Sequence, residues 1–208
     1  MSSSQVDAAS PCLITGAGGF IGQTLAESLL TEPSISAIIL TDVFEPPAPN
    51  NVPLNKSVKC IAADLTNASA LESLFQPAIK THFLLHGIMS GQAESDFELG
   101  MKVNFDSTRL ILDHLRKVNA GAVVVYTSST AIYGPPSTSS QTITEEVAPD
   151  PQSSYGAQKH MIETLLSDFS RRGFVDGRIV RLPTVGDHSY SLQLTRDQTF
   201  VTCIVSRC

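Results

Sequence analysis

The 208-residue sequence has no apolar run near the roughly 18 residues that a membrane-spanning helix needs. Residues 1–10 contain neither basic side chains nor an apolar core, so no secretory signal is expected there. Cysteine is scarce, with four residues, no CxxC pair and no compact framework. Cys12 and Cys60 fall in apolar strand-like runs, which is typical of small buried side chains. These absences predict a cytoplasmic protein in a reducing compartment, with no membrane partner.

Basic side chains are also fewer than acidic ones, with 14 Lys and Arg and 20 Asp and Glu. The net charge of -6 argues against general polyanion binding, and no nucleic-acid partner is expected. Backbone amides can still capture a phosphate locally. The length, with 42% apolar residues, is enough for one folded domain with a real core. We expect residues 1–10 to be a disordered leader and the domain to occupy residues 11–185.

A glycine-rich loop follows the first apolar run. The run at residues 12–15 predicts a strand, GAGGFIG occupies residues 16–22, and apolar residues then recur at helical spacing. Glycines at such a strand–helix turn let the backbone approach a pyrophosphate, and the helix N-terminus supplies amide donors. The sequence therefore predicts a dinucleotide-binding loop formed by Gly16, Gly19, Phe20, Ile21 and Gly22.

Two acidic residues follow the next predicted strands. Asp42 ends the strand at residues 37–41, 20 residues after Gly22, where a carboxylate would accept hydrogen bonds from an adenosine ribose. Such a carboxylate repels a ribose phosphate and so favours NAD over NADP; the alternative is a turn cap. Asp64 follows the strand at residues 58–62 and could bind the adenine amino group or cap the helix at residues 68–75. Leu65, which follows Asp64, is also expected to contact the cofactor.

The fourth predicted strand, at residues 82–86, ends at Gly87. Because the carboxyl ends of parallel strands face the ligand crevice, Gly87 and Ser90 are expected to line the cofactor. His86 has no partner His, Cys or acid at metal-ligand spacing. A hydrogen-bonded packing role is therefore expected for it rather than metal binding or general base catalysis.

The second half continues the alternation of strand and helix. A helical pattern runs over residues 96–117 and carries Asn104, and strands are predicted at residues 123–126 and 177–182. The loop at residues 135–154 is long and rich in Pro and Ser, which indicates a functional insertion. The pattern predicts an α/β fold, a Rossmann-type doubly wound parallel sheet with helices on both faces.

Tyr155 and Lys159 stand four residues apart in the next helical segment, so their side chains share one face. A neighbouring ammonium favours the phenolate, so the pair could abstract a proton near neutral pH. Tyr-x-x-x-Lys alone is common by chance. Hydroxyl groups at residues 127–130 follow a strand end, where a substrate-polarising group would sit, although the same residues are ordinary turn formers.

TGAGGFIG, Asp42, Asp64, the TSS at 127–129, YGAQK and LPTV together resemble the extended short-chain dehydrogenase/reductase family, over roughly residues 12–185. The runs SGQAESDFELGMKVN, SSYGAQK and SRRGFVDGR look most like its D-erythronate dehydrogenase branch. That resemblance implies NAD-dependent oxidation of the 2-hydroxyl of a small-molecule sugar acid with four carbons. It also implies a possible homodimer paired through helices near residues 96–117 and 154–172.

The resemblance assigns roles to individual residues. Tyr155 would be the general base, with Lys159 stabilising the phenolate and binding the nicotinamide ribose. Ser129 would orient the substrate hydroxyl, and Asn104 would position Lys159 through water. Pro183 and Val185 would lie near the nicotinamide.

Residues 186–208 do not resemble the family's continuation, although one strand is expected around residues 199–205. The expectation is a truncated or divergent C-terminus that leaves the substrate lobe largely missing. Two alternatives stay open: a nucleotide-sugar epimerase or dehydratase, and a non-catalytic NAD-binding protein.

Overall fold

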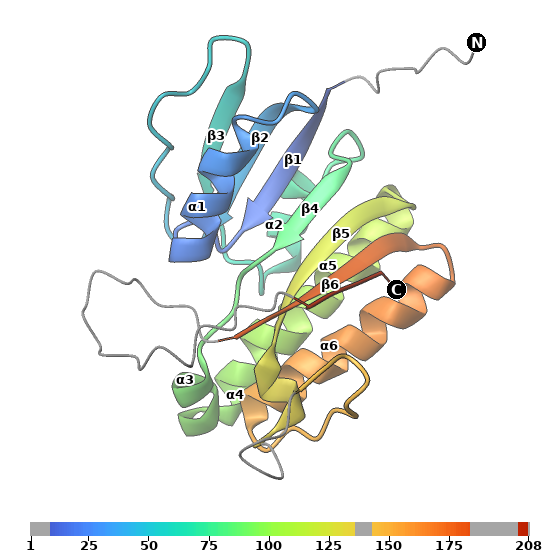
Figure 1. Cartoon of the computed structure of the whole chain (residues 1–208). Helices are drawn as coiled ribbons and strands as arrows, with labels where there is room; N and C mark the ends of the chain where they lie inside the picture. The colour runs from blue at the N-terminus through green and yellow to red at the C-terminus, as the bar shows by residue number, and fades with distance from the viewer. Residues whose placement is uncertain (1–8, 136–142, 184–203, 208) are drawn as a thin grey trace.

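The computed structural model describes residues 9–135, 143–183 and 204–207. Its centre is a seven-stranded sheet in the order β3-β2-β1-β4-β5-β6-β7 (Figure 1). All neighbouring strands pair in parallel except β7, which runs antiparallel to β6. The strands are β1 (Ser10–Thr15), β2 (Ile35–Asp42), β3 (Ser57–Ala62), β4 (Thr81–Leu84), β5 (Ala122–Ser129), β6 (Val175–Leu182) and β7 (Ile204–Arg207).

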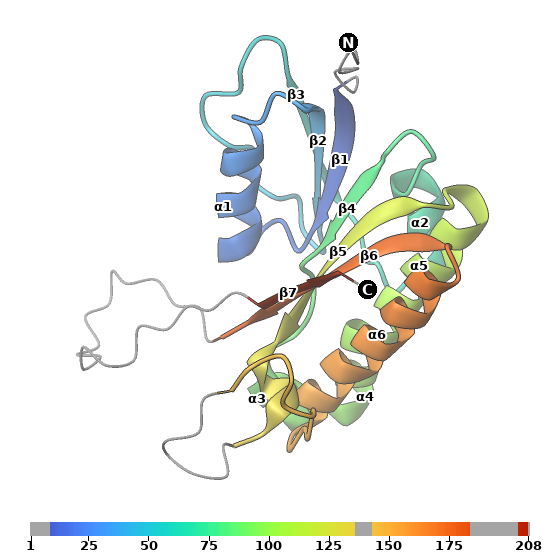
Figure 2. The ribbon, with the colours of Figure 1, turned by 45° about the vertical axis from the view of Figure 1, so that its right-hand side comes forward.

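Helices cover both faces of the sheet (Figures 1 and 2). The first helix, α1, packs against β1 and β2, while α6 packs against β5 and β6 on the side that also holds α5. Two short segments are not α-helical: η1 is a π-helix and η2 is a 3-10 helix. The helical segments are α1 (Phe20–Leu29), α2 (Ala68–Leu74), α3 (Ser90–Ser95), α4 (Phe97–Gly100), η1 (Met101–Asp106), α5 (Ser107–Val118), η2 (Thr130–Tyr133) and α6 (Ser154–Arg171).

The alternation of side chains along β1 explains the two layers. Cys12 and Ile14 belong to the core cluster beneath α1, whereas Leu13 belongs to the cluster beneath α2, α5 and α6. All three are fully buried, because a central parallel strand is covered on both faces. The strand order reverses between β1 and β4, so the ends of these strands open a crevice at the carboxyl edge of the sheet.

The predicted Rossmann-type fold is confirmed, and all six predicted parallel strands are present. β1 begins at Ser10, inside the predicted leader, whose residues 1–8 lie outside the described part of the chain. The strand expected around residues 199–205 meets β7 only at residues 204 and 205, because 199–203 are not described. Cys12 is buried as expected, and Cys60 is only partly buried.

The single helix predicted at residues 96–117 is present as one uninterrupted helical run from Phe97 to Val118, but η1 within it is a π-helix. Asp96 is an N-cap that accepts a hydrogen bond from the Leu99 N–H at 3.0 Å, and α4 then passes into η1 before α5 begins. A π-turn takes one more residue than an α-turn, so it rotates the following side chains around the helix axis. Within the described residues, no helix is both long and apolar enough to cross a membrane.

Candidate active site

Two adjoining cavities lie along the carboxyl edge of the sheet. The first, of about 290 Å³, is lined by residues that follow β1, β2, β3 and β4. The second, of about 170 Å³, lies between the ends of β4, β5 and β6 and the start of α6. Leu85, Gly87 and Ile88 line both cavities, so the two form one trough across the crevice.

The glycine loop leaves the N-terminus of α1 open to a ligand. Gly19 is the N-cap residue, no side chain caps the helix, and its first turn holds no acidic residue. Gly22 stands so close to the loop that a Cβ on it would lie 2.5 Å from the Gly16 carbonyl oxygen. The chain therefore folds back tightly enough to present backbone N–H groups at the first cavity. That arrangement fits a pyrophosphate.

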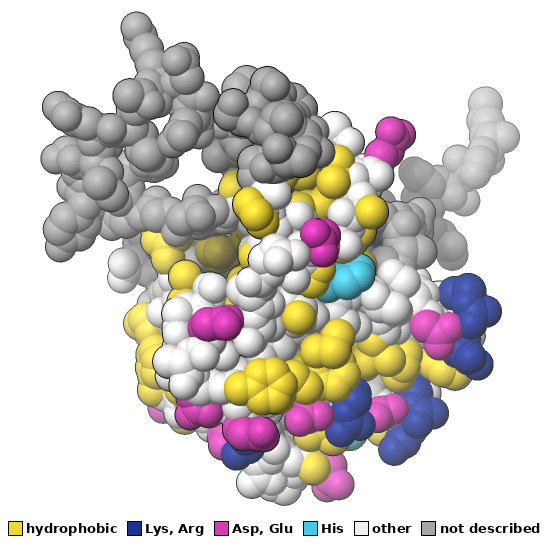
Figure 3. Space-filling view, turned by 90° about the horizontal axis from the view of Figure 1, so that it is seen from below, with side chains coloured by type: hydrophobic (Ala, Val, Ile, Leu, Met, Phe, Trp, Pro, Cys, Tyr) yellow, Lys and Arg dark blue, Asp and Glu magenta, His cyan; other side chains and the backbone are white. Residues whose placement is uncertain are grey.

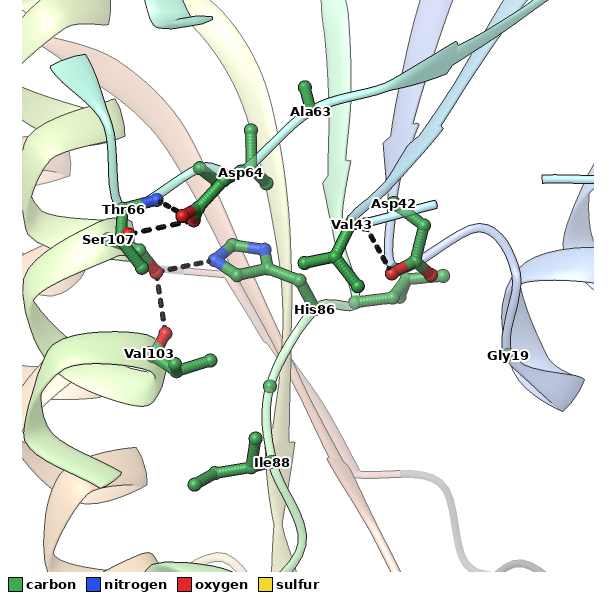
Figure 4. Close-up of a pocket in the computed structure, with 14 residues that line it drawn as sticks. Gly19, Asp42, Val43, Ala63, Asp64, Thr66, His86, Ile88, Val103 and Ser107 are labelled. Carbon is green, nitrogen blue, oxygen red and sulfur yellow. Dashed lines mark hydrogen bonds between the residues drawn. The ribbon is translucent and has the colours of Figure 1, made fainter. Parts of the chain in front are cut away.

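Asp42 ties the end of β2 to this loop. Its Oδ2 accepts a hydrogen bond from the Gly18 N–H at 2.9 Å, and its Oδ1 accepts one from the Val43 N–H at 2.8 Å. The carboxylate lies across the first cavity from Asp64 and beside the glycine loop (Figure 4). It is thus both a turn cap and a wall of the cavity, so the two interpretations of Asp42 are compatible.

Asp64 and Leu65 also line the first cavity. Asp64 Oδ1 accepts hydrogen bonds from the Thr66 N–H at 2.9 Å and the Thr66 hydroxyl at 2.7 Å (Figure 4), and these bonds lower the pKa of the carboxyl. The N-cap of α2 is Asn67, which accepts from the Ser69 N–H at 3.1 Å. Asp64 therefore does not cap the helix, and that alternative is wrong.

His86 forms the floor between the two aspartates (Figure 4). Its Nδ1 lies 2.7 Å from the Thr15 hydroxyl and its Nε2 lies 2.9 Å from the Ser107 hydroxyl. Burial, with a smaller effect of the Lys159 charge, lowers the pKa of His86 to about 3. The ring is a neutral, hydrogen-bonded support, as the sequence predicts. No cluster of His, Cys, Asp or Glu in the described residues could hold a metal ion.

Tyr155 and Ser129 meet in the second cavity. Ser153 caps α6 by accepting the Gly156 N–H at 3.1 Å, which begins the helix just before Tyr155. A Cβ on Gly156 would lie 2.4 Å from the Ala131 carbonyl oxygen, so glycine allows α6 to approach η2. Tyr155 is thereby brought close enough to Ser129 for the Ser129 side chain to lower its pKa.

Lys159 is buried and points toward the same cavity. Its Nζ donates to the Thr127 carbonyl at 2.9 Å and lies 4.8 Å from the Tyr126 ring centroid and 5.6 Å from that of Tyr155. Burial lowers the pKa of Lys159 to about 8, and the negative charge of Glu163 works against this effect. The ammonium therefore keeps its charge at neutral pH, although its pKa lies only slightly above that pH.

The pKa of Tyr155 runs against the sequence-based expectation. Burial raises it above its ordinary value, and the Ser129 side chain offsets only part of the rise. The expected net lowering by Lys159 is thus wrong for the chain alone. The largest cause is the burial of the phenol, while the Lys159 ammonium donates to the Thr127 carbonyl and lies over the Tyr126 ring.

Asn104 is buried in η1 and holds the loop after β4 rather than facing Lys159 directly. Its Oδ1 accepts from the Ile88 N–H at 2.8 Å, and its Nδ2 donates to the Gln158 Oε1 at 2.8 Å. Its link to Tyr155 and Lys159 therefore runs through the backbone beside Gly87 and through α6.

Most of the other predicted residues line the trough, and some do not. Ile21, Gly87 and Pro183 do, whereas Phe20 and Ser90 are exposed at the starts of α1 and α3 and line neither cavity. Val185 lies outside the described residues. Sequence reasoning missed several lining residues in the loops that follow β2, β3 and β4, a position that the strand-end rule could have flagged. They are Val43, Thr66, Ile88 and Met89.

The sequence profile of the NAD dependent epimerase/dehydratase family matches residues 12–207. Two curated relatives are D-erythronate dehydrogenases, from Haemophilus influenzae, 43% identical over 175 residues, and from Cupriavidus necator, 40% identical over 185 residues. Each alignment covers 83% of this chain and 54% of the relative, so the chain spans about half the length of these relatives.

A nucleoside-diphosphate-sugar epimerase from Agrobacterium tumefaciens has a similar solved structure, with a TM-score of 0.80 and 36% identity. The match covers 92% of this chain and 59% of that one. Together with the family profile, it confirms the predicted family, the predicted fold and NAD as the family's cofactor. The chain belongs to the NAD dependent epimerase/dehydratase family, whose members are NAD-dependent enzymes.

Proposed function

We propose that the protein of which this chain is part, or the whole, oxidises a hydroxyl of a small sugar acid such as D-erythronate with NAD. The observation that carries the proposal is the convergence of Ser129, Tyr155 and Lys159 on the cavity that adjoins the glycine loop. The substrate class is supported by the two D-erythronate dehydrogenases at 40% and 43% identity.

The first cavity would hold the adenosine half of NAD. The open N-terminus of α1 would donate to the pyrophosphate, Asp42 would accept from the ribose, and Asp64 and Leu65 would flank the adenine. The trough then leads past Gly87 to Pro183, which would border the nicotinamide. Bound NAD supplies the hydride acceptor and a positive charge beside the phenol.

In the second cavity, Ser129 would hold the substrate hydroxyl at the Tyr155 oxygen, and Tyr155 would take its proton. Burial alone opposes the phenolate, so the base works only when positive charge is close to the ring. Lys159 provides one such charge at 5.6 Å from the ring centroid. Asn104 would keep the loop at Ile88 in place, which limits the position of the substrate carbon.

Two other functions are alternatives to this proposal. A nucleotide-sugar epimerase or dehydratase is supported by the similar Agrobacterium tumefaciens structure. A non-catalytic NAD-binding role is the alternative if the 208 residues cannot enclose a substrate. NADH formation with D-erythronate, L-threonate and UDP-glucose, beside an NAD titration, separates the three. We expect turnover with D-erythronate, while NAD binding without turnover on any substrate would overturn the proposal.

A homodimer through α4 and α6 is also part of the proposal. Phe97 on α4 is 56% exposed and Met161 on α6 is 38% exposed, so both helices present apolar surface to a partner. Figure 3 shows a band of hydrophobic side chains across the underside of the molecule, bordered by Asp and Glu. Sedimentation equilibrium should give twice the chain mass, and a monomer at all concentrations would refute the pairing.

A further inference from the structure

A buried ion pair lies one helical turn beyond Lys159. Arg181 Nη2 donates to Glu163 Oε2 at 2.7 Å, and Arg181 Nε donates to Glu163 Oε1 at 2.9 Å. The side chains are 14% and 5% exposed, so this is a bidentate pair removed from water. Arg181 also donates to the Tyr133 hydroxyl and lies 5.2 Å from the centroid of that ring.

The pair joins α6 and β6, which both supply part of the second cavity, to η2, which borders it. Glu163 belongs to α6, Arg181 to β6 and Tyr133 to η2, which follows directly on Ser129. Figure 2 shows α6 lying along the strands at this end of the sheet. The pair is therefore placed to set the distance between the helix with the base and the strand ends that surround it.

Glu163 also acts on Lys159 by charge. The two residues are four apart on the buried face of α6, where neighbouring side chains lie close together. The other titratable groups around the ammonium carry no negative charge at neutral pH: Tyr126 and Tyr155 have raised pKa values, and His86 is neutral. His160 also neighbours the carboxylate, with its Nδ1 3.9 Å from Glu163 Oε2.

We propose that the Arg181–Glu163 pair is a positioning device for the reaction, in which the fixed carboxylate keeps Lys159 cationic beside Tyr155. The proposal rests on the proposed function, because it assumes that a charged Lys159 supports the base. It differs from a purely structural role, in which the pair would only hold β6 to α6.

Two substitutions separate these roles because they break the same contact but leave opposite charges. Glu163→Gln removes the negative charge near Lys159 and leaves Arg181, so Lys159 should lose its proton at lower pH. Arg181→Gln leaves the carboxylate without its neutralising partner, so Lys159 should keep its proton to higher pH. Each shift should be on the order of one pH unit. A purely structural role predicts no such opposite shifts in the pH at which Lys159 loses its proton.

The measurement is the ¹³Cε chemical shift of Lys159 in the full chain, titrated from pH 6 to 11 without substrate and assigned with Lys159→Ala. The matched control is Asp168→Asn, which breaks an ion pair with Arg172 on the exposed side of the same helix. It should leave the Lys159 midpoint unchanged. Midpoints of Glu163→Gln and Arg181→Gln that do not move, or that move together, would overturn the proposal.

Two further arms cover unfolding and activity. If either single variant fails to fold, the double variant Glu163→Gln/Arg181→Met removes both buried charges. A lowered Lys159 midpoint in the double variant supports the proposal, and an unchanged midpoint refutes it. In an active preparation, the alkaline limb of kcat should move down in Glu163→Gln and up in Arg181→Gln. Because the titration needs no turnover, it stands even if the proposed reaction fails.

Discussion

Replacing Gly22 by alanine tests whether the tight glycine loop binds NAD. The new Cβ would lie 2.5 Å from the Gly16 carbonyl oxygen and 2.7 Å from Ala17 Cα, and both are backbone atoms that no rotamer change can move aside. Real Cβ contacts essentially never fall below 3.0 Å, so the loop must retreat by at least about 0.5 Å. The backbone at the N-terminus of α1 moves with it.

The expected effect on binding is larger than the effect on folding. A retreat of this size takes a hydrogen bond out of its 2.7–3.2 Å range. Losing one bond to a charged ligand costs about 1.5–3 kcal/mol, which raises the Kd for NAD roughly 10- to 100-fold. Overpacking costs about 1–3 kcal/mol of stability, but alanine regains about 1 kcal/mol in a helix. The free energy of unfolding should therefore fall by at most about 2 kcal/mol.

Fluorescence titration with NAD and urea unfolding measure the two effects in the same preparation. Gly91→Ala in α3 is the matched control, because a Cβ there meets nothing within 4 Å. It should leave the Kd unchanged and increase the free energy of unfolding by about 0.5–1 kcal/mol. A Gly22→Ala chain that is folded and binds NAD with the original Kd would refute the reasoning.

Two further predictions concern Asp42 and the buried histidines. Asp42→Ala should raise the Kd for NAD roughly tenfold and reduce the preference for NAD over NADP, because it removes the carboxylate that would bind the ribose. Titration with both cofactors measures this preference, and an unchanged preference would contradict the prediction. Burial lowers the pKa of His82 to about 4 and of His86 to about 3, against about 6.5 in an unfolded chain. Unfolding therefore takes up protons as the pH falls below 6.5, and the free energy of unfolding should drop by roughly 2 kcal/mol between pH 6 and 5. Urea unfolding at the two pH values tests this, His82→Gln should remove about half of the drop, and equal stabilities would contradict it.

The order of strands and helices was predictable because each strand carries a local signal. Apolar runs such as residues 12–15 and 123–126 end at glycine or hydroxyl residues. The end of each strand is therefore signalled by residues that adjoin it in the sequence. The π-helix η1 inside the predicted helix was missed. The apolar residues of 96–117 keep a helical spacing through it, so periodicity alone cannot reveal it.

The members of the site were largely predictable, and their electrostatics were not. Tyr155, Lys159 and Ser129 do come together, since strand ends and helix starts share one edge of the sheet. The direction of the shift in the Tyr155 pKa depends on how deeply the fold buries the phenol. The Glu163–Arg181 pair joins residues 18 positions apart whose meeting depends on how α6 packs on β6. Such contacts arise from tertiary packing, which spacing in the sequence does not encode.

The central claim is that Tyr155 removes the proton of the substrate hydroxyl, and Tyr155→Phe tests it most directly. The change removes one hydroxyl from a side chain that lines the second cavity with Ser129, and it leaves the first cavity untouched. NADH formation with D-erythronate should fall at least about 10³-fold, while the Kd for NAD stays within about twofold. A Tyr155→Phe chain that forms NADH at a near-normal rate would contradict the account.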